Sequence, residues 1–191
     1  MMFFQIENID NFSDKELYEV FDRLSKSQQS YILKKATNKR KESLAVRALF
    51  ERLLLKHFEN ISINQLDFYN KAPVIMAEEN IYVSFSHSSN MVACAVSDKP
   101  VGIDIERIRD VNQRTVLKSC TTEEANFLLL GKKEDFFKIW TLKEAYIKAV
   151  GGGFADMKQK SFVKNGNIIC KDGEFEIKQD QTYDYIWSLY F

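Results

Sequence analysis

The sequence contains few of the residues that mark secreted, metal-rich or disordered chains. Its three cysteines are an odd number and have no CxxC spacing. A disulfide framework or a zinc site is therefore not expected, and a reducing, cytoplasmic compartment is predicted. With only 2 prolines against 15 phenylalanines and 45% hydrophobic residues, the composition is that of a globular chain rather than a disordered one.

The charge balance and the short hydrophobic runs argue against two classes of partner. Lys+Arg and Asp+Glu both number 27, so the net charge is zero and a broad nucleic-acid-binding surface is not expected. No stretch approaches the ~18 consecutive apolar residues of a membrane span. The first residues also lack the basic and apolar regions of a secretory signal. We therefore expect neither nucleic acid nor a membrane as a partner.

Residues 101–106 (VGIDIE) predict a short strand that carries two carboxylates on one face. Side chains alternate along a strand, so Asp104 and Glu106 point to the face opposite Ile103 and Ile105. At about 3.3 Å rise per residue, the two carboxylates lie roughly 6.6 Å apart. That spacing lets both reach one hard cation.

A second informative stretch is the helix predicted over residues 136–150. Trp140, Glu144 and Lys148 recur at helical spacing on one face of it. Glu144 and Lys148 could form a simple surface pair worth about 0.3–0.5 kcal/mol. Alternatively, Glu144 is partly buried in line with Trp140, where a carboxylate needs a partner or a metal. The three glycines at 151–153 then end the helix.

Two upstream stretches carry basic and polar groups. A long amphipathic helix is predicted over residues 38–58, with Arg40 and Arg47 on one face about 10.5 Å apart. That face is either simply solvated or a phosphate clamp. Residues 86–90 (SHSSN) predict a polar turn between two apolar strands. His87 in this turn is either merely exposed or a phosphate donor.

The remaining patterns predict an α+β fold in two similar halves. Other expected elements are helices near 14–24 and 27–36, strands near 66–69, 74–77, 81–85 and 92–96, hairpins at Asn165-Gly166 and Asp172-Gly173, and a last strand near 183–190. Residues 107–119 show no clear periodicity and predict a loop or irregular helix. Helices and then strands precede residue 100, and a strand, helices and strands follow it. The predicted halves are therefore residues 1–100 and 101–191.

Together these residue types predict magnesium-dependent chemistry on a phosphate or diphosphate. Oxygen ligands without cysteine suit Mg²⁺ better than zinc. Mg²⁺ beside lysine, histidine and arginine suits a diphosphate, where catalysis consists of positioning and charge neutralisation. A P-loop nucleotide site is not expected, because the only glycine cluster follows a helix and does not precede one.

Two motifs resemble a known family. Residues 102–106 (GIDIE), followed at a distance by residues 140–148 (WTLKEAYIK), are similar to the paired signature of the 4′-phosphopantetheinyl transferases. The Ser86-His87-Ser88 stretch, the helix with Arg40 and Arg47, and the two-half layout resemble the larger, monomeric Sfp-type branch. The resemblance covers roughly residues 34–153 of the chain.

The resemblance implies an activity and a fold. The implied reaction transfers the phosphopantetheine arm of coenzyme A to a serine of an apo acyl or peptidyl carrier protein and releases 3′,5′-ADP. The implied fold is a pseudo-dimer of two α/β halves, with residues 1–100 contacting the nucleotide, residues 101–191 carrying the magnesium and catalytic motifs, and the active site at their interface. A non-catalytic coenzyme A-binding relative is the alternative.

The resemblance also implies a role for each matching residue. Asp104, Glu106 and Glu144 would bind Mg²⁺. The diphosphate would be contacted by Lys148, His87, Ser86 and Ser88. The nucleotide end would be held by Arg40, Arg47 and Lys71.

Two of these assignments depart from a simple match. Lys71 stands in Asn70-Lys71-Ala72-Pro73, where the family usually has Gly-Lys-Pro. Asn tolerates positive φ better than most residues, so the turn can survive the change. Glu124 aligns with a glutamate that would take the proton from the carrier serine. Thr121 and Glu124 also fit a capping box, so a purely structural role stays open.

Overall fold

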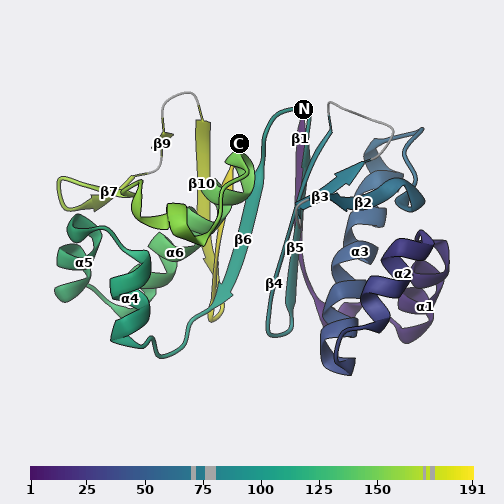
Figure 1. The fold of residues 1–191 in the computed structure, drawn as a ribbon, viewed down its shortest axis with the longest axis horizontal. Helices are drawn as coiled ribbons and strands as arrows, with labels where there is room; N and C mark the ends of the chain where they lie inside the picture. Colours follow the sequence, from purple (N-terminus) through teal and green to yellow (C-terminus); the bar gives the residue numbers. More distant parts are fainter. Residues whose placement is uncertain (70–71, 76–80, 170, 173–174) are drawn as a thin grey trace. The chain divides into compact units, whose positions relative to one another are not determined.

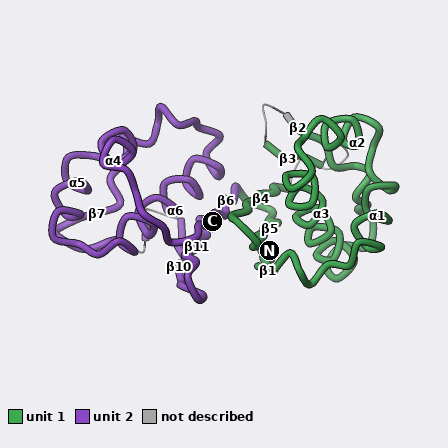
Figure 2. Tube along the Cα trace, turned by 90° about the horizontal axis from the view of Figure 1, so that it is seen from below, with its two compact units in different colours: residues 1–99 green, residues 100–191 purple. Residues whose placement is uncertain are grey.

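The computed structural model describes residues 1–69, 72–75, 81–169, 171–172 and 175–191. The chain divides into two compact units, Met1–Lys99 and Pro100–Phe191, which Figure 2 colours separately. The α+β class is confirmed, because both units combine helices with antiparallel sheets. Each unit is described below by itself.

Unit 1 packs helices against a five-stranded antiparallel sheet (Figure 1). Its elements are β1 (Met2–Asn8), a 3₁₀ turn (Ile9–Asn11), α1 (Asp14–Arg23), α2 (Lys26–Leu33), α3 (Thr37–His57), a second 3₁₀ turn (Ile63–Gln65), β2 (Leu66–Tyr69), β3 (Ala72–Ile75), β4 (Tyr82–Ser88) and β5 (Met91–Ser97). The strands lie in the order β1-β5-β4-β3-β2. Helix α3 packs on β1, β4 and β5, while α1 and α2 pack on α3.

The sequence explains the helices of unit 1. Ser13 caps α1 by accepting from the backbone N–H of Glu16, and the helix buries Leu17 and Val20. The apolar stripe of α3 includes Leu49 and Phe50, both fully buried in the core above the sheet. Burying these stripes supplies most of the stability of such helices, because propensity alone is weak.

Unit 2 places a long helix across a four-stranded sheet. Its elements are β6 (Gly102–Arg107), α4 (Gln113–Ser119), α5 (Thr122–Leu129), α6 (Lys133–Val150), a 3₁₀ turn (Phe154–Lys158), β7 (Val163–Lys164), β8 (Asn167–Ile168), β9 (Lys171–Asp172), β10 (Phe175–Thr182) and β11 (Tyr185–Tyr190). The sheet has the order β6-β11-β10-β9, and β7 pairs separately with β8. Helix α6 packs on β6 and β11.

The two units share one order of elements. Each begins with a strand, continues with three helices and ends with further strands. In each, the first strand pairs antiparallel with the last: Met2 faces Ser97 in unit 1, and Gly102 faces Tyr190 in unit 2. In each, the third helix packs on that pair of strands. Two similar halves are expected to share such an order of elements and such a pairing of first and last strands.

Some predicted boundaries were wrong. Ser86, His87 and Ser88 lie within β4, because this strand continues to Ser88 through its pairing with β5. The turn is confined to Ser89 and Asn90, and Ser89 adopts a left-handed φ of 53°. Residues 113–119 form the regular helix α4, capped by the side chain of Asn112. Strand β1 was not expected at all.

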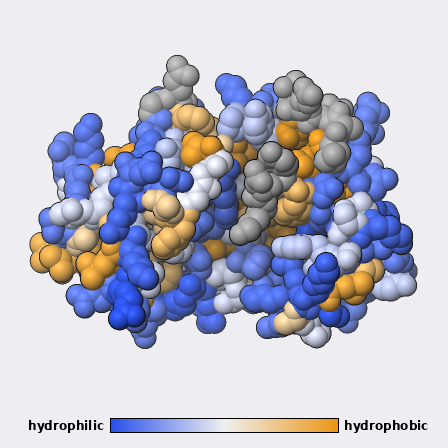
Figure 3. All heavy atoms as spheres, in the orientation of Figure 1, coloured by the Kyte–Doolittle hydropathy of each residue, from blue (hydrophilic) through white to orange (hydrophobic). Residues whose placement is uncertain are grey.

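The surface carries scattered apolar side chains. On the face drawn in Figure 3, hydrophilic side chains are the most widespread, and hydrophobic ones gather in smaller groups. Exposed large side chains include Leu117, Leu129 and Leu130 of unit 2. No helix in the described part of the chain has the length and apolar character needed to cross a bilayer.

Candidate functional site

Gly102 lets strand β6 cross helix α6 at very short range. A Cβ added at Gly102 would lie 1.8 Å from the carbonyl oxygen of Ala145 and 2.9 Å from the backbone nitrogen of Ala149. No side-chain carbon tolerates such distances, so only glycine fits. The crossing brings the carboxylates of β6 beside Glu144 and Lys148 of α6.

An ion pair joins the two sequence motifs at this crossing. The ammonium of Lys148 donates to Asp104 Oδ1 at 2.7 Å and to the carbonyl oxygen of Ile103 at 2.9 Å. Asp104 is only 4% exposed. A buried carboxylate needs such a partner, since an isolated buried charge is costly. The predicted surface pair of Glu144 with Lys148 is absent from the ion pairs of the described residues, where Lys148 contacts Asp104 instead.

Burial and two nearby carboxylates oppose the ionisation of Glu144. Burial raises the pKa of Glu144, and the nearby carboxylate of Asp104 raises it further. Lys148 acts in the opposite direction, and Glu106 adds a smaller upward contribution. Glu106 itself contacts Arg109, with 2.9 Å between Oε2 and Nη1. Three carboxylates, those of Asp104, Glu106 and Glu144, thus lie near one another at the β6–α6 crossing of unit 2.

This donor set fits a hard divalent cation. Carboxylates that raise one another's pKa are stabilised when a cation binds between them, and oxygen ligands are those that Mg²⁺ prefers. Among the residues that the structure describes, no group of three or more His, Cys, Asp or Glu side chains has a ready metal-binding arrangement. Asp104, Glu106 and Glu144 therefore stay a predicted ligand set.

Glu124 lies fully buried at the start of α5. Its Oε2 accepts from the backbone N–H of Thr121 at 2.8 Å, and Thr121 caps the helix in return, so the capping box is formed. Its Oε1 accepts from the backbone N–H of Phe162 at 2.8 Å. With 0% exposure, the carboxylate has no surface from which it could reach a substrate hydroxyl in this structure.

Lys143 completes the surroundings of Glu124. Its ammonium lies 2.8 Å from Glu124 Oε2 and donates to the carbonyl oxygens of Met157 and, at 2.7 Å, of Lys160. Lys143 is 1% exposed and directly precedes Glu144 in α6. The pair therefore ties α5, α6 and the segment after α6 together. Sequence analysis missed Lys143; the signal was a lysine inside the apolar pattern of α6.

In unit 1, His87 lies beside the beginning of α3. Its Nδ1 is 3.1 Å from Glu42 Oε2, and Lys39 Nζ lies 2.7 Å from the same oxygen. Ser86 and Ser88 flank His87 along β4, and each is 8% exposed. Glu42 was also missed by sequence analysis, because nothing in the periodicity of α3 indicates that its carboxylate contacts strand β4.

Arg47 does not share a solvated face with Arg40. Arg47 is 2% exposed, since Gln28 of α2 and Phe68 of β2 cover it: its guanidinium donates to Gln28 Oε1 at 2.7 Å and lies over the Phe68 ring at 5.1 Å. It also donates to Ser43 Oγ at 2.7 Å, and burial lowers its pKa to about 10. The solvated-face interpretation is therefore wrong for Arg47.

Arg40 and Lys71 complete the predicted nucleotide-side residues. Arg40 donates to the carbonyl oxygens of Lys35 at 2.8 Å and Leu33 at 2.7 Å, at the C-terminal end of α2. A cation is favourable there because the last carbonyl groups of a helix are otherwise unsatisfied. Lys71 lies outside the described residues. The phosphate contacts assigned to these residues stay predictions.

A family model matches the half of the chain that carries the carboxylates. Residues 100–188 match the model of the 4′-phosphopantetheinyl transferase superfamily. The matched segment contains Asp104, Glu106, Glu144 and Lys148. The predicted resemblance to the 4′-phosphopantetheinyl transferases is confirmed.

Individual 4′-phosphopantetheinyl transferases are also similar to this chain. The transferase gsp of Aneurinibacillus migulanus is 35% identical over 123 residues, which cover 57% of this chain and 50% of that protein. The transferase psf-1 of Bacillus pumilus is 32% identical over 122 residues, covering 58% and 52%. The transferase Sfp of Bacillus subtilis is 30% identical over 87 residues, covering 44% and 39%. The chain spans about half the length of the relatives it matches.

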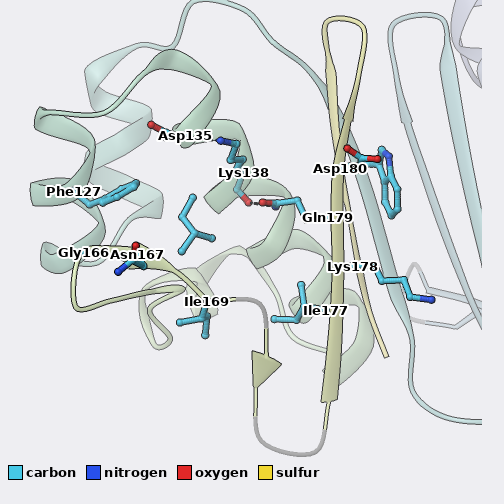
Figure 4. Close-up of a pocket in the computed structure, with 12 residues that line it drawn as sticks. Phe127, Asp135, Lys138, Gly166, Asn167, Ile169, Ile177, Lys178, Gln179 and Asp180 are labelled. Atoms are coloured by element: carbon cyan, nitrogen blue, oxygen red, sulfur yellow. Dashed lines mark hydrogen bonds and ion pairs between the residues drawn. The ribbon is translucent and has the colours of Figure 1, made fainter.

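A separate cavity of about 740 Å³ lies in unit 2 (Figure 4). It is lined by α5, α6, β10, β11 and the segment around β8, including Phe127, Ile169 and Trp187. At its margin, Gln179 Nε2 donates to the carbonyl oxygen of Lys138 at 2.9 Å. None of the predicted site residues that the structure describes lines this cavity, so it is distinct from the carboxylate region at the β6–α6 crossing.

Proposed function

We propose that this chain is a Mg²⁺-dependent 4′-phosphopantetheinyl transferase. The observation that supports the proposal most strongly is the β6–α6 crossing, where Lys148 pairs with Asp104, and where burial and the carboxylates of Asp104 and Glu106 raise the pKa of Glu144. The residues of both matching motifs meet at this crossing. A chance match to the two sequence motifs would not require their side chains to interact.

The proposed reaction moves the phosphopantetheine arm of coenzyme A to a carrier protein. The serine oxygen of an apo acyl or peptidyl carrier forms a bond to the β-phosphorus and gives up its proton to solvent. The bond from that phosphorus to the bridging oxygen breaks, and this oxygen leaves with 3′,5′-ADP. When bound, Mg²⁺ neutralises diphosphate charge. Asp104, Glu106 and Glu144 would hold it, and the ammonium of Lys148 would face the charge that grows on the leaving group.

Residues of unit 1 would bind the rest of coenzyme A. His87 would donate to a phosphate oxygen, with Ser86 and Ser88 beside it. Arg40 and Lys71 are proposed at the nucleotide end. For Arg47 we propose no direct phosphate contact, because its guanidinium is buried against Gln28 and Ser43. We assign Glu124 the role of a positioning residue, since its carboxylate is paired with Lys143 inside unit 2.

Some parts of the proposal concern the whole protein. We propose a cytoplasmic monomer made of two pseudo-equivalent halves with the active site at their interface. The shared order of elements supports the pseudo-equivalence. The non-catalytic alternative would keep coenzyme A binding but not the transfer.

The test is a transfer assay with the purified chain. Coenzyme A, Mg²⁺ and several apo carrier proteins are supplied, and the mass of each carrier is measured. We expect a mass gain of one phosphopantetheine on the carrier serine. Glu144→Gln should abolish the gain, whereas Glu176→Gln, on the exposed side of β10, should keep it. Coenzyme A binding with no mass gain on any carrier would favour the non-catalytic alternative.

A further inference from the structure

Glu42 is a carboxylate whose contacts none of the roles above uses. It lies near the N-terminal end of α3 and is 9% exposed. Both of its oxygens accept from the ammonium of Lys39, at 2.9 and 2.7 Å. Its Oε2 also lies 3.1 Å from Nδ1 of His87. A carboxylate this deeply buried needs hydrogen-bonding partners, since burial without them would be costly. Lys39 and His87 are those partners.

The contact between Glu42 and His87 is built on rigid elements. Glu42 stands on α3, and His87 stands on β4, where it pairs with Val92 of β5. Helix α3 packs on both β4 and β5. The distance between the two side chains is therefore set by helix-on-sheet packing and not by a loop. A site of this kind holds a ring orientation better than a loop does.

The position of the carboxylate determines which imidazole nitrogen carries a proton. A carboxylate accepts hydrogen bonds and cannot donate when ionised, so the Nδ1 that faces it must carry hydrogen. The proton at Nδ1 fixes the tautomer of the neutral ring. In the imidazolium form, Nε2 becomes a second N–H donor. Lys39 holds the carboxylate in place.

We propose that Glu42 is a positioning residue that holds a proton of His87 at Nδ1 and fixes its ring, so that Nε2, which carries a second proton in the imidazolium form, is the nitrogen that donates to a phosphate oxygen of coenzyme A. The inferred tautomer follows from the contact between Glu42 and His87 and does not depend on the proposed function. The phosphate contact rests on the proposed function above. The arrangement resembles the carboxylates that orient histidines at metal sites, but its target here is an anion.

The tautomer can be measured directly, because the chain has only two histidines. Long-range ¹H–¹⁵N NMR spectra distinguish Nδ1–H from Nε2–H, and a His57→Gln variant assigns the two rings. At a pH where the ring is neutral, we expect His87 in the Nδ1–H form. Glu42→Gln should shift it toward a mixture of tautomers, because an amide can donate as well as accept. An Nε2–H ring in the unsubstituted protein would overturn the proposal without any variant.

The phosphate role is tested by coenzyme A binding, measured by calorimetry. We expect Glu42→Gln to weaken binding about five- to tenfold, in line with loss of one positioned charge-assisted contact. Glu51→Gln is the matched control, since Glu51 lies on the same helix and pairs with Arg23 at the surface. It should bind coenzyme A like the unsubstituted protein.

A double-variant cycle separates positioning from an independent effect. In a His87→Ala background, Glu42→Gln should cause no further loss of affinity, because its effect passes through the ring. Equal losses in both backgrounds would overturn the positioning role. If the unsubstituted chain binds no coenzyme A at all, the proposed function fails, while the NMR result still decides which nitrogen of His87 carries the proton.

Discussion

At the scale of single residues, the most consequential arrangement is the buried pair of Glu124 and Lys143. Both side chains are almost fully excluded from solvent, and each has further backbone partners. Two buried charges are tolerated only when both are paired and hydrogen-bonded. The pair therefore joins α6 to α5 at Lys143, the residue directly before Glu144.

Removing one partner should be more harmful than removing both. Lys143→Met or Glu124→Gln leaves one buried group without its partner, so we expect each to lower the free energy of unfolding by about 3–5 kcal/mol. The double variant should recover part of this loss. Urea unfolding followed by circular dichroism measures all three. If Glu124→Gln left stability unchanged and lowered only the transfer rate, a catalytic role would replace the structural one.

Glu144 should make stability depend on pH in a direction unusual for a carboxyl group. Its raised pKa means that the folded state holds the proton more tightly than the unfolded state. Stability from this group is thus present at low pH and is lost as pH rises from its ordinary pKa, near 4.5, through the raised one. Urea midpoints between pH 4 and 7 should show this loss.

The Glu144→Gln variant provides the comparison for that pH series. The amide cannot ionise, so its midpoints should fall less than those of the unsubstituted protein over the same range. Added Mg²⁺ should raise the midpoint of the unsubstituted protein at pH 7 more than that of Glu144→Gln, because a ligand that binds only the folded state stabilises it. Parallel curves for the two proteins would contradict the electrostatic account of this region.

At the scale of elements, the crossing of β6 and α6 leaves no room for a side chain at Gly102. Gly102→Ala must push the strand away from the helix, because its Cβ would meet backbone atoms that cannot turn aside. We expect loss of transfer activity and a lower thermal midpoint. Gly153→Ala is the matched control, since a Cβ there meets nothing within 4 Å and its φ of −139° suits any residue.

Elements whose pattern is local were predictable from the sequence. The β6 strand and the α6 helix have clear periodicities, so their carboxylates and Lys148 could be named in advance. Strand β1 could not, because its pairing partner β5 lies about 90 residues further along and its own side chains show no strict alternation. The pairing of β4 with β5, also not evident from local pattern, places residues 86–88 of the expected polar turn in a strand.

The wrong or missing predictions for residues of the candidate site have a common physical origin. Helical spacing places Arg40 and Arg47 on one side of α3, but it does not reveal that α2 and β2 cover the second position. Likewise, the apolar pattern around Lys143 does not reveal that Glu124 of α5 is the partner of its ammonium. Burial of a polar group depends on tertiary partners, which residue spacing does not contain.

At the scale of the whole molecule, two units repeat one order of elements while carrying different side chains at comparable places. In unit 2, the first strand and third helix carry the predicted magnesium ligands. In unit 1, the third helix carries Glu42 and Lys39, which contact His87 on a neighbouring strand. One backbone plan thus supports an acidic cluster in one unit and a mixed basic and acidic cluster in the other.

The pairing of each unit's first strand with its last also affects how the chain is made on the ribosome. Strand β6 is the first element of unit 2 to be made, yet its partner β11 is synthesised about 80 residues later, which takes roughly 4 to 16 s at usual rates of translation. During that delay the backbone of β6 lacks the strand with which it pairs, although α6 is already available to cover its apolar side chains. The first strand of each newly made unit is therefore the segment for which we expect the greatest need of a chaperone.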